Sequence, residues 1–145
     1  MIHKQTFDFL RDIKNNNSKE WMDENRENYQ LAKENILEVA ELLIANISKF
    51  DGNISALHLD PKKCITRLNR DLRFSKDKTP YKAHFANSFS RLGKELRGGY
   101  FLRIRPGESF LAGGFWKPSK EDLFRNRKEI ELDASEIKDI LKLKN

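Results

Sequence analysis

An amphipathic stretch between Trp21 and Phe50 constrains the fold of this chain most strongly. Apolar side chains recur along it at intervals of three or four residues, and glutamate, lysine and arginine fill most of the positions between them. This interval matches the turn of an α-helix, so the stretch predicts one long helix with a buried face and a solvated back. The residues Asp51-Gly52-Asn53 are expected to end the helix, because they favour a turn.

A shorter helix is predicted before the long one, with Thr6 as its N-cap and its apolar residues on one face. The asparagines at 15–17 should break this short helix, since asparagine tolerates turn conformations. Asn17 and Glu20 then have the spacing of a capping pair at the start of the long helix.

From Cys64 onward the spacing of apolar residues changes to two, which is typical of β-strands. Glycine or proline marks several of the connections between the alternating segments, including 92–99, so the strands should follow one another as hairpins. The predicted strands cover residues 64–74, 81–89, 100–105 and 109–116.

The predicted fold class is therefore α+β. One short and one long N-terminal helix should be followed by an antiparallel meander sheet of about four strands. Ser119 and Asp133 stand where N-caps of C-terminal helices are expected. Nothing in the composition marks a linker, so residues 1–145 are expected to form a single domain.

Several classes of site are excluded by composition. Cys64 is the only cysteine, so the chain has neither an internal disulfide nor a cysteine-based zinc site. The three histidines, His3, His58 and His84, have no partners at ligand spacing, and no metal site is expected. No apolar run approaches the roughly 18 residues of a membrane span. We expect a cytoplasmic protein without a membrane partner.

The positive charge of the chain is concentrated between Lys62 and Lys82. This segment holds eight bases and two acids, so its net charge of +6 equals that of the whole chain. Such a local excess predicts binding of an anion, and a phosphate-bearing small molecule is the ligand we favour. Arg67, Asp71 and Arg73 share one face of the predicted strand, where the carboxylate can orient a guanidinium for bidentate capture of a phosphate.

Arg70 interrupts the apolar face of the same strand, and the loop after it adds lysines and a hydroxyl group. The side chains that border the loop complete the candidate ligand-binding site. Its residues are Arg67, Arg70, Asp71, Arg73, Ser75, Lys76, Lys78, Tyr81, Lys82 and His84.

Three alternatives compete with binding of a small anion. An enzyme of phosphoryl or acyl chemistry would use His84, Asp71 or Asp77 as acid or base in a concave pocket. A purely structural ion-pair cluster would lose its stability in Arg73→Ala. Nucleic-acid binding is the weaker alternative, and it would mix bases with stacking rings. Its candidate residues are Arg103, Arg105, Tyr100, Phe101 and Trp116.

Several motifs occur in order along the chain, and together they resemble a family of uncharacterised bacterial and fungal proteins, a conserved domain of unknown function. The resemblance spans residues 7–123, and it implies no activity, cofactor or catalytic residue. Members of that family continue beyond the last residue of this chain, so the chain is expected to be an N-terminal portion of a longer family domain. The matching motifs are Asn15-Asn16-Asn17 with Glu20-Trp21, Asp60-Pro61-Lys62-Lys63-Cys64, the segment from Arg70 to Lys82, Gly98-Gly99-Tyr100, Pro106-Gly107-Glu108-Ser109 and Gly113-Gly114-Phe115-Trp116.

Overall fold

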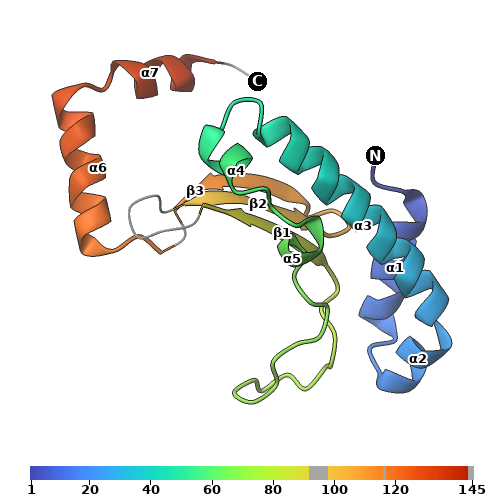
Figure 1. Cartoon of the computed structure of the whole chain (residues 1–145). Helices are drawn as coiled ribbons and strands as arrows, with labels where there is room; N and C mark the ends of the chain where they lie inside the picture. Colours follow the sequence, from blue (N-terminus) through green and yellow to red (C-terminus); the bar gives the residue numbers. More distant parts are fainter. Residues whose placement is uncertain (92–97, 116, 144–145) are drawn as a thin grey trace. The chain divides into compact units, whose positions relative to one another are not determined.

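The computed structural model describes residues 1–91, 98–115 and 117–143, and it divides into two compact units, Met1–Gly114 and Phe115–Asn145. In the first unit, helices come before an antiparallel sheet (Figure 1), so the predicted α+β class is confirmed. The helices of this unit are α1 (Lys4–Asn15), α2 (Lys19–Glu24), α3 (Arg26–Ile47), α4 (Gly52–Ala56) and α5 (Pro61–Cys64). Its strands are β1 (Phe85–Ser90), β2 (Gly99–Ile104) and β3 (Phe110–Gly114).

The predicted long helix is divided into α2 and α3 at Asn25. The backbone of Asn25 leaves helical geometry, and its side-chain amide donates to the Trp21 carbonyl at 2.9 Å. The N-cap of α2 is Ser18, whose hydroxyl accepts from the Trp21 amide at 3.1 Å, so the predicted cap at Asn17 is one residue too early. Asparagine competes with the helix for backbone hydrogen bonds, which accounts for the break.

Thr6 is not an N-cap, because it lies inside α1 and is buried. Its hydroxyl donates to the Asn35 side chain of α3 at 2.9 Å, so it joins two helices instead. Asp51 was expected to end the long helix, but α3 already ends at Ile47. Its carboxylate accepts from the backbone amides of Asn53 and Ile54, and so caps α4.

Asp51 also anchors the sheet to the helices. Its side chain is 3% exposed and accepts from the Arg91 guanidinium at 2.6 Å and from the Tyr100 hydroxyl at 3.0 Å. The hydrogen bond from Arg91 is the largest cause of the lowered pKa of this carboxyl group. A buried carboxylate needs such partners to remain charged.

The core lies between the helices and one face of the sheet. One buried cluster joins α1, α2 and α3 to Phe85 and Ile104, and a second joins the end of α3 to Ile54 and Phe89. The rings of Phe9 and Phe85 stack at 6.2 Å between centroids. Burial of these apolar side chains is the main force that holds the helices on the sheet.

Over the described residues, the sheet is an antiparallel meander of three strands in the order β1-β2-β3. The pairing of Phe85 with Ile104 turns both toward the core, whereas Phe101 and Arg103 lie on the opposite face and belong to neither buried cluster. Tyr100 and Phe101 therefore face opposite sides. Predicted strand residue Trp116 and most of the predicted connection 92–99 lie outside the described residues.

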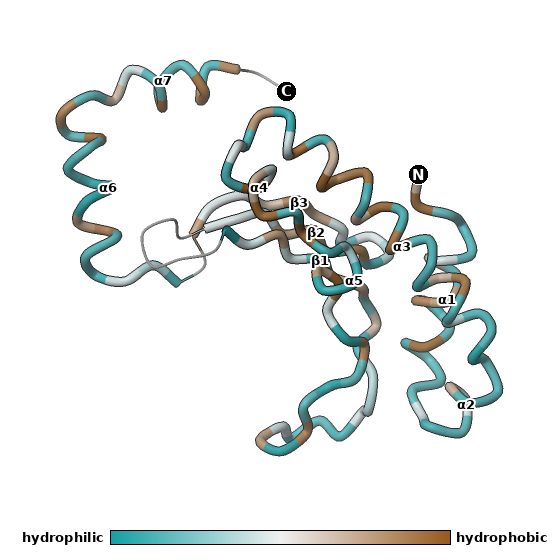
Figure 2. The backbone as a smooth tube through the Cα atoms, in the orientation of Figure 1, coloured by the Kyte–Doolittle hydropathy of each residue, from teal (hydrophilic) through white to brown (hydrophobic). Residues whose placement is uncertain are grey.

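The predicted strand over 64–74 is wrong, because its first residue ends α5 and the chain then leaves the sheet. In the described part of the chain, isolated bridges between Ile65 and Asn87 and between Asn69 and Tyr81 stand in place of a strand ladder here. Residues 66–82 instead run out and back as a narrow ribbon that we call the arm (Figure 1), with a hydrogen bond from the Arg70 amide to the Pro80 carbonyl at 2.9 Å. Figure 2 shows that the arm is mostly hydrophilic.

The second unit contains α6 (Lys120–Leu132) and α7 (Ser135–Lys142). Ser119 caps α6 as predicted, in a capping box with Asp122, whereas α7 begins after Ala134 and not at the predicted cap Asp133. None of the described helices combines the length and apolar character that crossing a membrane requires.

Candidate functional site

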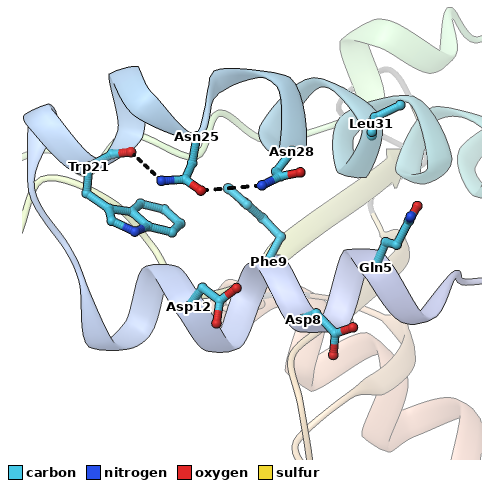
Figure 3. A pocket seen from close by; sticks show the side chains of 8 residues that line it. All are labelled: Gln5, Asp8, Phe9, Asp12, Trp21, Asn25, Asn28 and Leu31. Carbon is cyan, nitrogen blue, oxygen red and sulfur yellow. Dashed lines mark hydrogen bonds between the residues drawn. The ribbon is translucent and has the colours of Figure 1, made fainter.

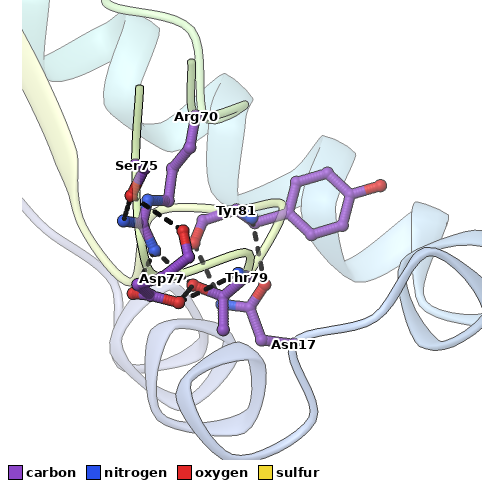
Figure 4. Close-up of polar contacts among 6 residues, drawn as sticks. All are labelled: Asn17, Arg70, Ser75, Asp77, Thr79 and Tyr81. Carbon is purple, nitrogen blue, oxygen red and sulfur yellow. Dashed lines mark hydrogen bonds and ion pairs between the residues drawn. The ribbon is translucent and has the colours of Figure 1, made fainter. Parts of the chain in front are cut away.

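Arg70 organises the tip of the arm. Its guanidinium donates to the Asp77 carboxylate and the Thr79 hydroxyl, and to the Ser75 hydroxyl at 3.3 Å (Figure 4). The Asp77 carboxylate also accepts from the Thr79 amide at 3.0 Å. This amide, followed by Arg70, lowers the pKa of Asp77 to about 2. The base that interrupts the predicted apolar face thus closes the loop on itself.

Asp71 orients Arg73, its neighbour at the same tip. Two guanidinium nitrogens of Arg73 meet the carboxylate, at 2.9 Å for Nε to Oδ1 and 2.6 Å for Nη2 to Oδ2. Hydrogen bonding by Arg73 is the main cause of the lowered pKa of Asp71. The Arg73 side chain remains 77% exposed, so this ion pair lies in solvent.

The lysines of the arm keep their charge uncompensated. Lys78 donates to the Leu72 carbonyl at 3.1 Å, and Lys82 to the Arg67 carbonyl at 2.8 Å. A carbonyl has no net charge and cannot neutralise an ammonium group. Among the described residues, no carboxylate forms a salt bridge with these two lysines, with Arg67 or with Lys76.

The arm is also tied to the turn between α1 and α2. The Asn17 side chain donates to the Tyr81 carbonyl at 2.9 Å and accepts from the Tyr81 amide at 3.0 Å (Figure 4). The Asn17 side chain thus bonds both backbone groups of Tyr81, as a residue of a neighbouring strand would. It fixes the point where the arm returns to the sheet.

Positive charges converge on His84 where the arm meets the sheet. His84 directly precedes β1, and the pairing of Phe85 with Ile104 brings it beside the end of β2. The pKa of His84 is lowered to about 4, by burial first and then by the charges of Arg103, Lys82 and Arg105. We call Arg67, Lys82, His84, Arg103 and Arg105 the basic junction.

Within the described residues, one carboxylate forms a salt bridge with the basic junction, and Asp71 interacts with Arg67 through charge alone. Glu108 accepts from Arg105 at 2.9 Å. The Nε of Arg103 is buried and has no hydrogen-bond partner in the described part of the chain. Burial, followed by the charge of Arg67, lowers the pKa of Lys82. The junction is therefore a place of excess positive potential, which attracts anions.

Two small recesses open on the described surface. One, of about 120 Å³, opens between α1 and the α2–α3 pair, with the rings of Phe9 and Trp21 and the carboxylates of Asp8 and Asp12 around it (Figure 3). A second of about 120 Å³ lies at the base of the arm. Both are smaller than the roughly 300 Å³ at which ligand pockets begin. Neither is lined by Asp71, Asp77 or His84.

Metal binding and cysteine chemistry find no support in this surface. Among the described residues, no three His, Cys, Asp or Glu side chains gather as metal ligands. Burial, with a smaller effect from Asp60, raises the pKa of the Cys64 thiol, so it is not an activated thiolate.

The model of a family described as "Conserved hypothetical protein (DUF2461)" matches residues 5–145. The chain belongs to the DUF2461 family. The family resemblance predicted from the motifs is thus confirmed. Comparison with curated proteins gave no match, and neither did comparison with solved structures.

In this DUF2461 chain the predicted site residues fall into two groups. The tip holds Arg70 and Ser75 in one network and Asp71 with Arg73 in another, while Lys82 and His84 lie at the basic junction. Tyr81 lies between the groups, bound through its backbone to Asn17.

From the sequence, Arg103 was a candidate only for nucleic-acid binding and not for the small-anion site. Its approach to His84 depends on the register of β1 against β2, in which Ala86 pairs with Arg103. The two-residue spacing of Arg103 and Arg105 on a predicted strand of the DUF2461 sequence puts both on one face, and this was the signal that could have added them to the site.

Proposed function

We propose that the chain binds a phosphate-bearing anion at the basic junction. The observation that carries the proposal is the convergence of Lys82, Arg103 and Arg105 on His84, with Glu108 as the one carboxylate bound there among the described residues. Like charges held together raise each other's free energy. A doubly charged phosphate would offset that cost and accept charge-assisted hydrogen bonds.

The residues divide into ligands and scaffold in this proposal. Arg103 and Lys82 would supply charge to the anion, and His84, neutral at pH 7, one ring N–H. Arg70 and Asp77 hold the loop in shape, because their hydrogen bonds are made to each other and to Ser75 and Thr79. A structural role thus fits the Arg70–Asp77 pair of the tip, and the predicted anion binding fits the junction.

Acid–base catalysis is a weaker reading of the same surface. A group with a pKa of about 4 is a poor proton donor near neutral pH, because so little of it is protonated.

We also propose a reducing, cytoplasmic setting, which suits the free thiol of Cys64.

Calorimetric titration of the full chain with pyrophosphate at pH 7.5 tests the proposal. We expect saturable binding that weakens about tenfold or more in Arg103→Gln, since a charge-assisted contact is lost. Arg11→Gln is the matched control, because Arg11 is 58% exposed, is paired with Asp8 on α1 and does not line the recess at the base of the arm. Absence of binding, or equal loss in both variants, would contradict the proposed site.

A further inference from the structure

We propose that the arm binds single-stranded nucleic acid, with one base stacked on Phe74. The inference rests on the anion binding proposed above, because the phosphates that follow the stacked base would reach the basic junction. Phe74 lies at the tip of the arm and is 96% exposed, the largest exposed fraction among the large apolar side chains described. Phe74 has no place in either buried cluster.

The ring of Phe74 suits a stacking partner. The Arg73 guanidinium carbon lies 6.0 Å from the ring centroid, so a cation already accompanies the ring. Asp71 holds that guanidinium in place through two nitrogens. Aromatic rings beside arginine are the usual platform for unpaired bases, whose flat faces stack without regard to sequence.

Hydrogen bonds within the arm close its tip. Arg70, Ser75, Asp77 and Thr79 close the loop by hydrogen bonds (Figure 4), and Lys78 crosses it to the Leu72 carbonyl at 3.1 Å. Binding to a preformed loop avoids much of the entropy cost of ordering it. The exposed ring of Phe74 therefore projects from a loop that its own hydrogen bonds hold closed.

The charge of the arm suits a polyanion. Its two acids are paired with Arg70 and Arg73, which leaves the other bases without a salt bridge among the described residues. These bases are spread along the arm and do not surround a single pocket. A strand of phosphates can contact spread charges one after another, whereas a single small anion cannot. The remaining bases are Arg67, Lys76, Lys78 and Lys82.

A single strand fits the tip better than a duplex or a membrane. Bases in a duplex are stacked on one another, and their faces are not free to receive Phe74. A membrane interface demands a larger apolar surface than one side chain. Within the arm, Phe74 is the one exposed large apolar residue.

Fluorescence anisotropy of a labelled oligothymidylate, titrated with the full chain, tests the inference. Phe74→Ala should weaken binding about tenfold, which is the usual loss for one stacked base, and Phe74→Trp should retain it. Lys76→Gln should reduce the slope of log affinity against log salt by about 0.7, the value for one phosphate contact on a single strand.

Phe124→Ala is the matched control. Phe124 is 61% exposed and has the Lys128 ammonium 5.9 Å from its ring centroid, so it has the same exposed aromatic and cation without the arm. We expect the Phe124→Ala variant to bind the oligothymidylate with the affinity of the wild type. Circular dichroism should be unchanged in both alanine variants, because both rings are solvent-exposed.

Three outcomes would overturn the inference: wild-type affinity in Phe74→Ala, an equal loss in Phe124→Ala, or binding of duplex as tight as that of single strand. Binding of anionic phosphatidylserine vesicles through Phe74, without binding of the oligonucleotide, would assign the tip to membranes and also refute it. Pyrophosphate titration separates the two proposals. If pyrophosphate binds but Phe74 is irrelevant to the oligonucleotide, only the nucleic-acid inference fails.

Discussion

The effect of pH on stability tests the environment of His84. Its pKa is about 4 in the folded chain, against an ordinary value of 6.5. Between these two values the unfolded chain binds a proton that the folded chain excludes. The free energy of unfolding must therefore fall as pH decreases from about 6.5 to about 4, and this contribution becomes constant below that window.

The size of the effect follows from the shift. Each pKa unit corresponds to about 1.4 kcal/mol, so the full shift would amount to roughly 3 kcal/mol. His84 is only partly buried, and solvent screening reduces the expected loss to about 1–2 kcal/mol. His84→Gln has no titrating ring at this position and should not show this loss.

Urea unfolding at pH 7 and pH 4.5, followed by circular dichroism, measures the difference. The wild type should lose about 1–2 kcal/mol more than His84→Gln between these two pH values. His3→Gln is the control, because His3 is exposed at the start of the chain and should behave as the wild type. An equal loss in His84→Gln and the wild type would refute the buried, positively charged environment of His84.

Three further substitutions test the buried ion pair and the exposed ion pairs of the arm. Asp51→Asn should cost about 2 kcal/mol in urea unfolding, since it weakens charged hydrogen bonds to a nearly buried group, and an unchanged midpoint would contradict this. Arg73→Ala should leave the midpoint of unfolding unchanged, because the Arg73 side chain is 77% exposed, whereas Arg70→Ala should speed amide exchange in the arm. A large loss of stability in Arg73→Ala would restore the structural role that the sequence alone allows for it.

The periodicity of apolar residues predicted the fold class, because the core is built from one face of each helix of the first unit and one face of the sheet. Intervals of three or four residues placed the helices, and the alternation around Phe85, Phe89 and Ile104 placed the buried face of the sheet. The same alternation failed over 64–74. An extended ribbon also alternates its side chains, and Phe74 follows the apolar pattern while lying in solvent.

The candidate site was predictable as a charge excess but not as a geometry. Arg70 meets Asp77 seven positions along the chain, which depends on how the loop turns and not on strand spacing. His84 meets Arg103 through the register of β1 and β2. Both contacts depend on tertiary structure that local patterns do not contain.

The pKa of His84 in the presence of an anion tests the proposed binding most directly. It can be followed by NMR of the imidazole protons, with sulfate as a doubly charged stand-in for phosphate and chloride at the same ionic strength as the reference. A bound anion offsets the charges of Arg103, Lys82 and Arg105, so the pKa should rise from about 4 by roughly one unit or more in sulfate, and not in Arg103→Gln. The same pKa in sulfate and in chloride would contradict an anion site at the basic junction.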